Sequence, residues 1–543
     1  MLSKIDLKLK SLTLIKMSNL IVPIKIQSYQ IDHLNRVCNI LHHHHCYVDT
    51  SRMGSGKTII AIAVAQKYGL SLIVVCPVST STKWQAECAK YGVKLITTIS
   101  YASLRGSKKY VPTHGLLIRR EDDYTVTEDY LKYVQAGILL VFDEVQNVKN
   151  DNAQLHAAHC LVTSLVSISS SSRIALLSET LCDQIKCSES LLKIMGIITK
   201  DKLYRYDQNL KLYEPEGIDQ VINKAKSLDL ETTNKILKTF ILDKKTASPL
   251  CYDLYDKVIK HYLSSSMSLK YQTKEIIITK DACNGYYEME PNDIELLHKG
   301  VSLLARSTRY REDTGTVDLR LGNWGEITQA LIMIEQSKVN VAIRLVKQDL
   351  LSNPDCKVIL YFNFIEDMKT LCDKLSEFNP LLMYGQTKLK KRDQIIQKFQ
   401  SDNNDYRLLI SNARVGGVGI DLDDHTGNHP RFMYIIPSYN FIELHQATGR
   451  VFRNTTKSSP KIRFIYSKQY PKETSIINAL SRKAEVTRNM SYDPTDNKFP
   501  DDYSTYIEGY DEYFPPLKAN KSCNDATKLN DEINCIKESV ANI

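Results

Sequence analysis

The octapeptide Ser-Arg-Met-Gly-Ser-Gly-Lys-Thr at residues 51–58 has the residue types and spacing of a phosphate-binding loop. Its two glycines allow backbone N–H groups to close around an anion. The apolar run Ile59–Ala65 predicts a helix that points its positive dipole end at the same anion. Lys57 can reach the outer phosphates, and the Thr58 hydroxyl can ligate Mg²⁺. The residues expected to line the loop are Met53, Gly54, Ser55, Gly56, Lys57 and Thr58. One departure is Ser51, which stands where glycine is usual.

A second polar group follows the apolar run at residues 137–142. This run predicts a buried strand, and the side chains at its carboxyl end would lie where such sheets bind ligands. We expect Asp143 to hold hydrated Mg²⁺, Glu144 to polarise the water that attacks the γ-phosphate, and Gln146 to sense that phosphate or orient the water. The same pattern would also fit a helix that begins after the strand and is stabilised by carboxylates in its first turn.

These residues need a parallel sheet to position them, and the chain repeats the required alternation twice. Strands are expected at 71–77, 137–143, 173–178, 357–362, 407–410, 432–436 and 462–466. The predicted fold is α/β, with two RecA-like P-loop lobes flanking a helical insert. The expected segments are an N-terminal extension (1–25), the first lobe (26–199), a mostly helical insert (200–336), the second lobe (337–490) and an acidic tail (491–543).

Composition narrows the class of protein. The formal net charge of +9 is asymmetric, since residues 491–543 carry −6 and residues 1–490 carry +15. A basic body suits a polyanionic partner such as nucleic acid, although a mildly basic solvated surface would look the same. Thirteen irregularly spaced cysteines favour a reducing intracellular compartment, and no apolar run reaches membrane-spanning length. We therefore expect an intracellular protein of the cytoplasm or nucleus, without a membrane partner.

The order of motifs resembles a superfamily 2 helicase, and in detail its Swi/Snf chromatin-remodeller-type ATPase branch. The run Asp-Glu-Val-Gln-Asn-Val-Lys-Asn at 143–150 resembles the remodeller Walker B motif, and Gln-Ala-Thr-Gly-Arg-Val-Phe-Arg at 446–453 resembles motif VI. Further resemblances are 28–30 to the adenine-sensing glutamine motif, 76–84 to motif Ia, 99–101 to motif Ib, 176–180 to motif III, 357–362 to motif IV and 415–422 to motif V. The resemblance covers roughly residues 26–480.

The resemblance implies an ATP- and Mg²⁺-dependent nucleic-acid translocase or helicase. Arg450 and Arg453 would be arginine fingers; three residues apart, they would share one face of a helix. Gln30, Gly419 and Asp421 would bind nucleotide. The implied coupling residues are Ser178, Thr180 and Gln446. The implied nucleic-acid contacts are Lys83, Ser100, Tyr101, Asn412, Arg414 and Gly416.

Four functions remain open on the sequence. Remodeller-like Walker B spacing and the long stretch between motifs III and IV favour a motor on duplex DNA over an RNA helicase. A non-catalytic nucleic-acid scaffold would not need Lys57, Asp143, Glu144 and both arginines together, and an ATP switch would make the basic surface incidental. Motif III departs from the family at Glu179, where glycine is usual. A composition rich in lysine, isoleucine and asparagine suits a large DNA virus, in which case the virion is a further location.

Overall fold

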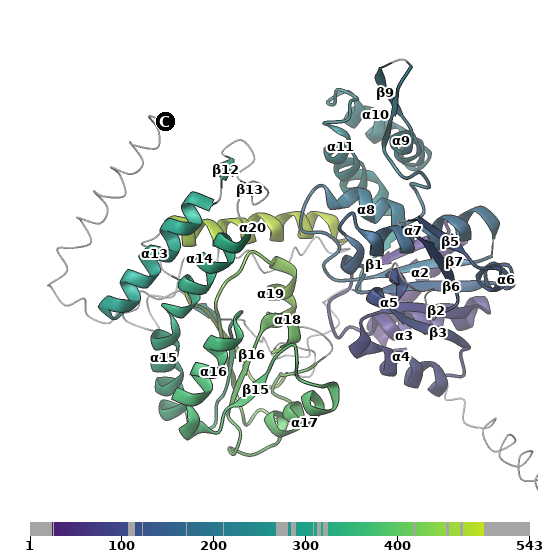
Figure 1. Cartoon of the computed structure of the whole chain (residues 1–543). Helices are drawn as coiled ribbons and strands as arrows, with labels where there is room; N and C mark the ends of the chain where they lie inside the picture. The colour runs from purple at the N-terminus through teal and green to yellow at the C-terminus, as the bar shows by residue number, and fades with distance from the viewer. Residues whose placement is uncertain are drawn as a thin grey trace, which may run out of the picture.

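The chain forms two lobes, each built on a six-stranded sheet in which all neighbouring strands are parallel (Figure 1). The computed structural model describes residues 24, 26–106, 114–121, 123–169, 171–209, 211–267, 281–283, 289–307, 309–311, 316–318, 324–416, 420–451, 456–466 and 471–492. Helices cover the sheets, as parallel strands require because both of their faces must be buried.

The first lobe has the strand order β10-β1-β7-β6-β2-β3. Its strands are β1 (Cys46–Asp49), β2 (Ser71–Cys76), β3 (Leu95–Ser100), β6 (Ile138–Asp143), β7 (Arg173–Leu177) and β10 (Ser264–Ser265). Its helices are α2 (Ser28–His43), α3 (Lys57–Tyr68), α4 (Val78–Lys90), α5 (Tyr101–Arg105), α6 (Glu128–Ala136), α7 (Ala153–Ile168) and α8 (Cys187–Ile194), with a hairpin of β4 (Leu117–Arg120) and β5 (Asp123–Val126). The central strands are continuous apolar runs because helices pack on both faces.

The second lobe has the strand order β11-β18-β17-β14-β16-β15. Alternate residues of its strands enter two separate apolar cores: Ile359 and Met433 join one, and Val358 and Phe432 join the other. Its strands are β11 (Asp281–Cys283), β14 (Lys357–Tyr361), β15 (Leu381–Met383), β16 (Leu408–Ser411), β17 (Arg431–Ile435) and β18 (Lys461–Phe464). Its helices are α15 (Val339–Ser352), α16 (Ile365–Lys374), α17 (Leu389–Gln400), α18 (Ala413–Gly416) and α19 (Phe441–Thr448).

Between the two sets of strands, residues 204–336 add mainly helices. The elements are the hairpin β8 (Tyr204–Asp207) and β9 (Leu212–Pro215), the helices α9 (Gly217–Leu228), α10 (Leu230–Leu237), α11 (Ala247–Leu254), α12 (Lys260–Leu263), α13 (Pro291–Ser307) and α14 (Trp324–Gln336), and the strands β12 (Arg309–Arg311) and β13 (Thr316–Asp318). This region also supplies an edge strand to each large sheet, β10 to the first and β11 to the second. Strand β10 has two residues and β11 has three, and strands this short leave no pattern in the sequence from which they could be predicted.

Helix α20 (Pro471–Met490) extends from the second lobe to the first (Figure 1). Ile476, Leu480 and Ala484 belong to a second-lobe core, whereas Met490 is buried in the first-lobe core. Near its end, Thr487 Oγ1 donates to Cys182 O at 2.7 Å. The helix therefore joins the two lobes through packed apolar surface at both ends.

The seven strands expected from the sequence are confirmed, with boundaries shifted by no more than two residues. The α/β class with two parallel sheets is confirmed as well. Among the described residues, none of the helices combines the length and the apolar character that a membrane span requires.

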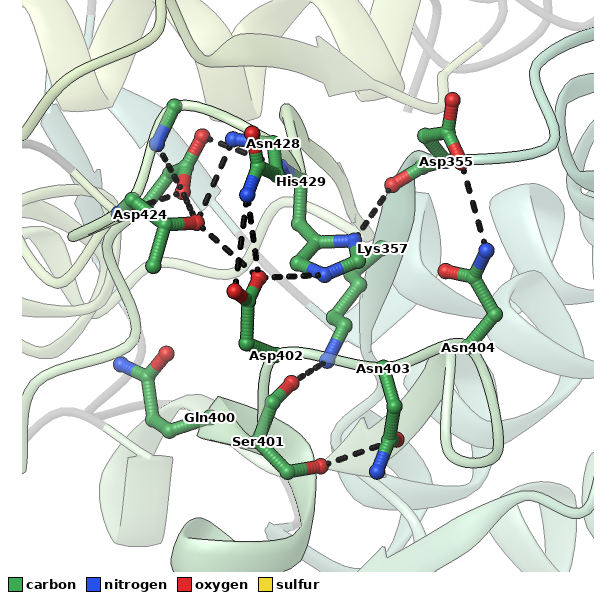
Figure 2. A network of polar contacts seen from close by, with 12 residues as sticks. Asp355, Lys357, Gln400, Ser401, Asp402, Asn403, Asn404, Asp424, Asn428 and His429 are labelled. Carbon is green, nitrogen blue, oxygen red and sulfur yellow. Dashed lines mark hydrogen bonds and ion pairs between the residues drawn. The ribbon is translucent and has the colours of Figure 1, made fainter.

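A polar network around the buried Lys357 lies at the amino edge of the second sheet (Figure 2). Lys357, at the start of β14, is fully buried, and its Nζ donates to Phe399 O at 2.8 Å and Ser401 O at 2.5 Å. Asp402 pairs with His429 at 3.1 Å, and Asp424 accepts backbone N–H groups of its own loop. Burial, followed by repulsion from Arg431, lowers the pKa of Lys357 to about 8.

Replacing this lysine should change how stability depends on pH. In the unfolded chain a lysine titrates near ~10.4, so between about pH 8 and 10 the unfolded state binds more protons than the folded state, and stability rises with pH. Lys357→Met removes this gain and also leaves two carbonyls without their donor, at a cost of about 1–3 kcal/mol. Urea unfolding at several pH values should therefore show a deficit of the variant that widens from pH 7.5 to 10. Lys374→Met, at an exposed lysine of the same lobe, is the control, and a deficit that stays constant with pH would contradict the prediction.

Candidate nucleotide site between the lobes

The predicted phosphate loop connects β1 to α3, and its backbone has the conformation that its glycines permit. Gly54 and Gly56 have φ angles of +78° and +100°, a region that other residues rarely occupy. Lys57 Nζ donates to Ser51 O at 2.6 Å and to Arg52 O at 3.0 Å. The loop is thus folded onto its own lysine, and its carbonyl groups compensate the ammonium charge.

Ser51, the departure from the usual glycine, anchors the base of the loop. Its backbone N–H donates to Asp49 Oδ1 at 2.9 Å, and its hydroxyl accepts from Met267 N at 2.9 Å. Burial would raise the pKa of Asp49, but the charge and hydrogen bond of His33 hold it below its usual value. His33 also contacts Ser265 of β10 at 2.8 Å. The serine therefore ties the loop to the segment that leaves the first sheet.

Gln30 lies against the loop from α2. Its side-chain amide donates to Ser55 O at 3.0 Å, and its carbonyl oxygen accepts from Gln27 N at 2.9 Å. A Cβ atom added to Gly56 would lie 2.3 Å from Gln30 Nε2. The loop and the predicted adenine-sensing glutamine are consequently in direct contact.

Asp143 ends β6 in a buried position beside two aromatic side chains. Trp84 Nε1 donates to its Oδ2 at 2.9 Å, and the Tyr101 hydroxyl donates to its backbone carbonyl at 2.8 Å. Burial, followed by the charge of Glu144, raises the pKa of Asp143 to about 6. Glu144 has a φ of +57°, a strained conformation for a residue with a side chain. Because of this turn, the consecutive carboxylates of Asp143 and Glu144 point in different directions at the carboxyl end of the sheet.

A chain of side-chain hydrogen bonds runs from the first lobe to the second. Ser178 Oγ donates to Gln146 Oε1 at 2.6 Å, and Gln146 Nε2 donates to Glu144 Oε2 at 2.6 Å. Gln446 of α19 donates to the same Glu144 oxygen at 3.1 Å. The backbone N–H of Thr180 donates to Ser178 Oγ at 2.9 Å. Five of the predicted catalytic and coupling residues are therefore connected through Glu144.

Arg450 of the predicted motif VI does not lie on a helix, so the prediction of a helical position is wrong for this residue. Helix α19 ends at Thr448, so Arg450 lies in the turn that follows, where its Nη1 donates to Ile420 O at 3.1 Å. The turn contacts the phosphate loop, because a Cβ added to Gly449 would lie 2.5 Å from Met53 Cε. Arg453 and Gly419 lie outside the described residues.

The remaining candidates differ in exposure. Lys83 is exposed on α4, and Asp421 is exposed beyond β16. Tyr101 is buried, with 5% of its surface exposed, so the expectation that its side chain contacts nucleic acid does not fit this conformation. Ser100 caps α5 by accepting from Ser103 N, and Asn412 caps α18 by accepting from Val415 N. Arg414 and Gly416 belong to α18, and Thr58 is half-buried in the first turn of α3.

Sequence reasoning missed three contributors to the site: Trp84 as a donor to Asp143, the contact of Met267 with Ser51, and the pair Glu179–His445, in which the side chains approach to 3.3 Å. Only Glu179 left a signal, as a departure from the family pattern. Fewer than three potential His, Cys, Asp or Glu metal ligands come together anywhere in the described part of the chain.

The two parallel sheets, the glycine-containing loop before α3 and the acidic end of β6 form an arrangement typical of P-loop nucleotide-binding proteins. The family described as "Helicase conserved C-terminal domain" matches residues 337–455. A putative ATP-dependent RNA helicase, L364 of Acanthamoeba polyphaga mimivirus, is 24% identical over 84% of this chain and 82% of its own length. The chromatin structure-remodeling complex subunit snf21 of Schizosaccharomyces pombe is 20% identical over 73% of this chain and 34% of its own length.

A solved structure, the Sulfolobus solfataricus SWI2/SNF2 ATPase core in complex with dsDNA, aligns with 87% of this chain and 98% of its own at 17% identity, with a TM-score of 0.28. The chain thus spans most of the viral relative but about a third of the yeast subunit. Residues 337–455 match a helicase family domain, and over most of its length the chain is similar to a viral protein named as a putative ATP-dependent RNA helicase.

The two glycines that flank α3 provide a matched test of the loop. Gly56→Ala places a Cβ against Gln30 at a φ of +100°, whereas Gly69→Ala, at the other end of the helix with a φ of +63°, meets no atom within 4 Å. We expect Gly69→Ala to lose about 1 kcal/mol of stability through backbone strain and to keep its KM for ATP. Gly56→Ala should be less stable and should raise KM at least severalfold. Equal KM values for the two variants in steady-state ATPase assays would show that Gly56 does not shape the site.

Proposed function

We propose that the protein is an ATP-dependent motor that moves along or remodels nucleic acid, with duplex DNA as the preferred substrate. The observation that supports this function best is the hydrogen-bond chain that connects Glu144 to Ser178 on one side and to Gln446 of the other lobe on the other. A residue placed to activate water is thereby sensitive to the spacing of the lobes. Closure and reopening of two lobes around ATP is the cyclic motion that a translocase needs.

In the proposed site, each group has a chemical task. Lys57 exchanges its loop carbonyls for phosphate oxygens, and the loop amides of residues 53–58 surround the same anion. Thr58 and Asp143 offer the hydroxyl and carboxylate oxygens that Mg²⁺ prefers, with Asp143 acting through water. Bound Mg²⁺ would offset charge on the phosphoryl oxygens. Gln30 would contact the nucleotide from α2, and Gly419 and Asp421 would contact it from the second lobe.

Hydrolysis itself would rest on residues of both lobes. Glu144 would accept the proton of the attacking water, and Gln146 would orient that water. Arg450 and Arg453 would stabilise charge on the transferred phosphoryl group, a contribution that can reach ~10³–10⁵ in rate. Because Arg450 follows α19 directly, movement of this helix would bring it to the phosphate or remove it. Ser178, Thr180 and Gln446 would transmit that movement.

The proposed track for nucleic acid lies on loops at the carboxyl ends of the sheets. Lys83 supplies an exposed cation, while Ser100, Asn412, Arg414 and Gly416 stand at the first turns of short helices, where backbone N–H groups suit phosphate contact. The name of the chromatin structure-remodeling relative favours the duplex DNA of chromatin, whereas the name of the mimivirus relative favours RNA as the second candidate. Ten cysteines of the described part of the chain are free thiols, which fits a reducing compartment such as cytoplasm or nucleus.

Glu144→Gln tests the proposed general base. The variant should bind ATP with near-normal affinity, because the phosphate loop is unchanged, and should hydrolyse it at least about a hundredfold more slowly. Glu189→Gln, the same charge change elsewhere in the first lobe, is the control and should retain full turnover. Near-normal hydrolysis by the Glu144 variant would refute the assignment of the general base.

The choice of substrate is tested by ATPase rates with duplex DNA, single-stranded DNA and RNA at one fixed salt concentration, since phosphate contacts are strongly salt-dependent. We expect the largest stimulation with duplex DNA. A larger stimulation by RNA would support the RNA helicase, and an unstimulated but active ATPase would support a switch that does not use nucleic acid.

A further inference from the structure

Glu179 connects the phosphate loop to the opposite lobe. It stands two residues beyond β7, and its Oε2 accepts from the backbone N–H of Met53 at 3.0 Å. Its other oxygen, Oε1, lies 3.3 Å from His445 Nε2 on α19. Only 7% of Glu179 and 3% of His445 are exposed, so the contact is shielded from solvent.

The carboxylate is held in its charged form. Burial would raise the pKa of Glu179, but the hydrogen bond and charge of His445, followed by the charges of Lys57 and Arg52, hold it well below its usual range. Lys57 is also the cation proposed to meet the outer phosphates of ATP. The negative charge of Glu179 therefore already interacts with Lys57, the cation that the phosphates of ATP would have to approach.

Helix α19 and the turn after it contact residues of the candidate nucleotide site at two further points. Gly449 packs against the end of the Met53 side chain, and Gln446 donates to Glu144. Met53 is consequently held from both sides, its N–H by Glu179 and its side chain by the turn after α19. Loosening Glu179 would remove one of these two contacts between Met53 and its surroundings.

We propose that Glu179 is a positioning residue that latches the phosphate loop to α19 through His445, and that entering ATP displaces its carboxylate from the loop. The inference rests on the proposed function, since it concerns regulation of the same nucleotide site. Two anions that favour the same positive loop oppose each other, so the latch and ATP are negatively coupled. Whatever strengthens the latch weakens ATP binding, and ATP binding in turn releases the loop from Glu179.

The decisive variant is Glu179→Gln, which keeps the size and one hydrogen-bond acceptor of the side chain but removes its charge. Equilibrium binding of a fluorescent ATP analogue with Mg²⁺ should become about tenfold tighter, because the competing charge is gone. Stimulation of the ATPase by duplex DNA should fall, because the loop no longer follows the second lobe. A residue that merely supported the fold would give the opposite result, weaker binding on replacement.

Two further variants complete the test. His445→Phe keeps an aromatic ring but removes the donor from the other lobe, so it should also tighten binding, and combining it with Glu179→Gln should give no additional gain. Asp183→Asn, at a buried carboxylate of the same lobe that pairs with Lys149 at 2.6 Å, is the matched control and should leave binding unchanged.

Unchanged or weaker binding by Glu179→Gln with a normal thermal midpoint would overturn the latch. If that variant fails to fold, His445→Phe decides by the same criterion. These binding measurements need no hydrolysis, so they fail independently of the proposed motor. Loss of turnover in Glu144→Gln together with unchanged binding in Glu179→Gln would leave the proposed function standing and remove only the latch.

Discussion

The ammonium group of Lys57 imposes the constraint on which the nucleotide site depends. A half-buried cation must be compensated, and without a phosphate the chain does so with the carbonyl oxygens of Ser51 and Arg52 and the nearby carboxylates of Asp49 and Glu179. The two carboxylates contact different neighbours, Asp49 the side chain of His33 on α2 and Glu179 that of His445 in the second lobe. The charge at the loop thereby organises contacts well beyond it.

Parallel strand topology places these groups together. Asp49, Asp143 and Ser178 end or follow β1, β6 and β7, which are adjacent in the sheet, so their side chains meet at one edge although they are distant in sequence. The second lobe approaches that edge with α19. The site is therefore a product of strand order in one lobe and of a single helix in the other.

The sequence was sufficient for the parts of the structure that have strong local patterns. Apolar strands such as Ile138–Asp143 and the glycine-containing loop before α3 follow directly from residue type and spacing. Features that depend on tertiary contacts were not accessible. The end of α19 before Arg450, the burial of Tyr101 and the edge strand β10 are decided by neighbours remote in the chain.

Glu179 is a residue that the sequence marks as unusual but whose contacts it does not predict. Its departure from the family pattern was visible in the sequence, but its meaning required the positions of Met53 and His445, which are 126 and 266 residues away. A local pattern can flag such a residue, whereas its partners emerge only once the lobes are placed.

Helix α20 has a mechanical consequence. Ile476, Leu480 and Ala484 are packed in one apolar core and the last residue, Met490, in another, so a helix rather than a flexible loop joins the two lobes. A helix resists bending far more than a loop does. Rotation of one lobe against the other must then pivot about this helix or pull Met490 out of the first-lobe core, which would limit the range of that rotation.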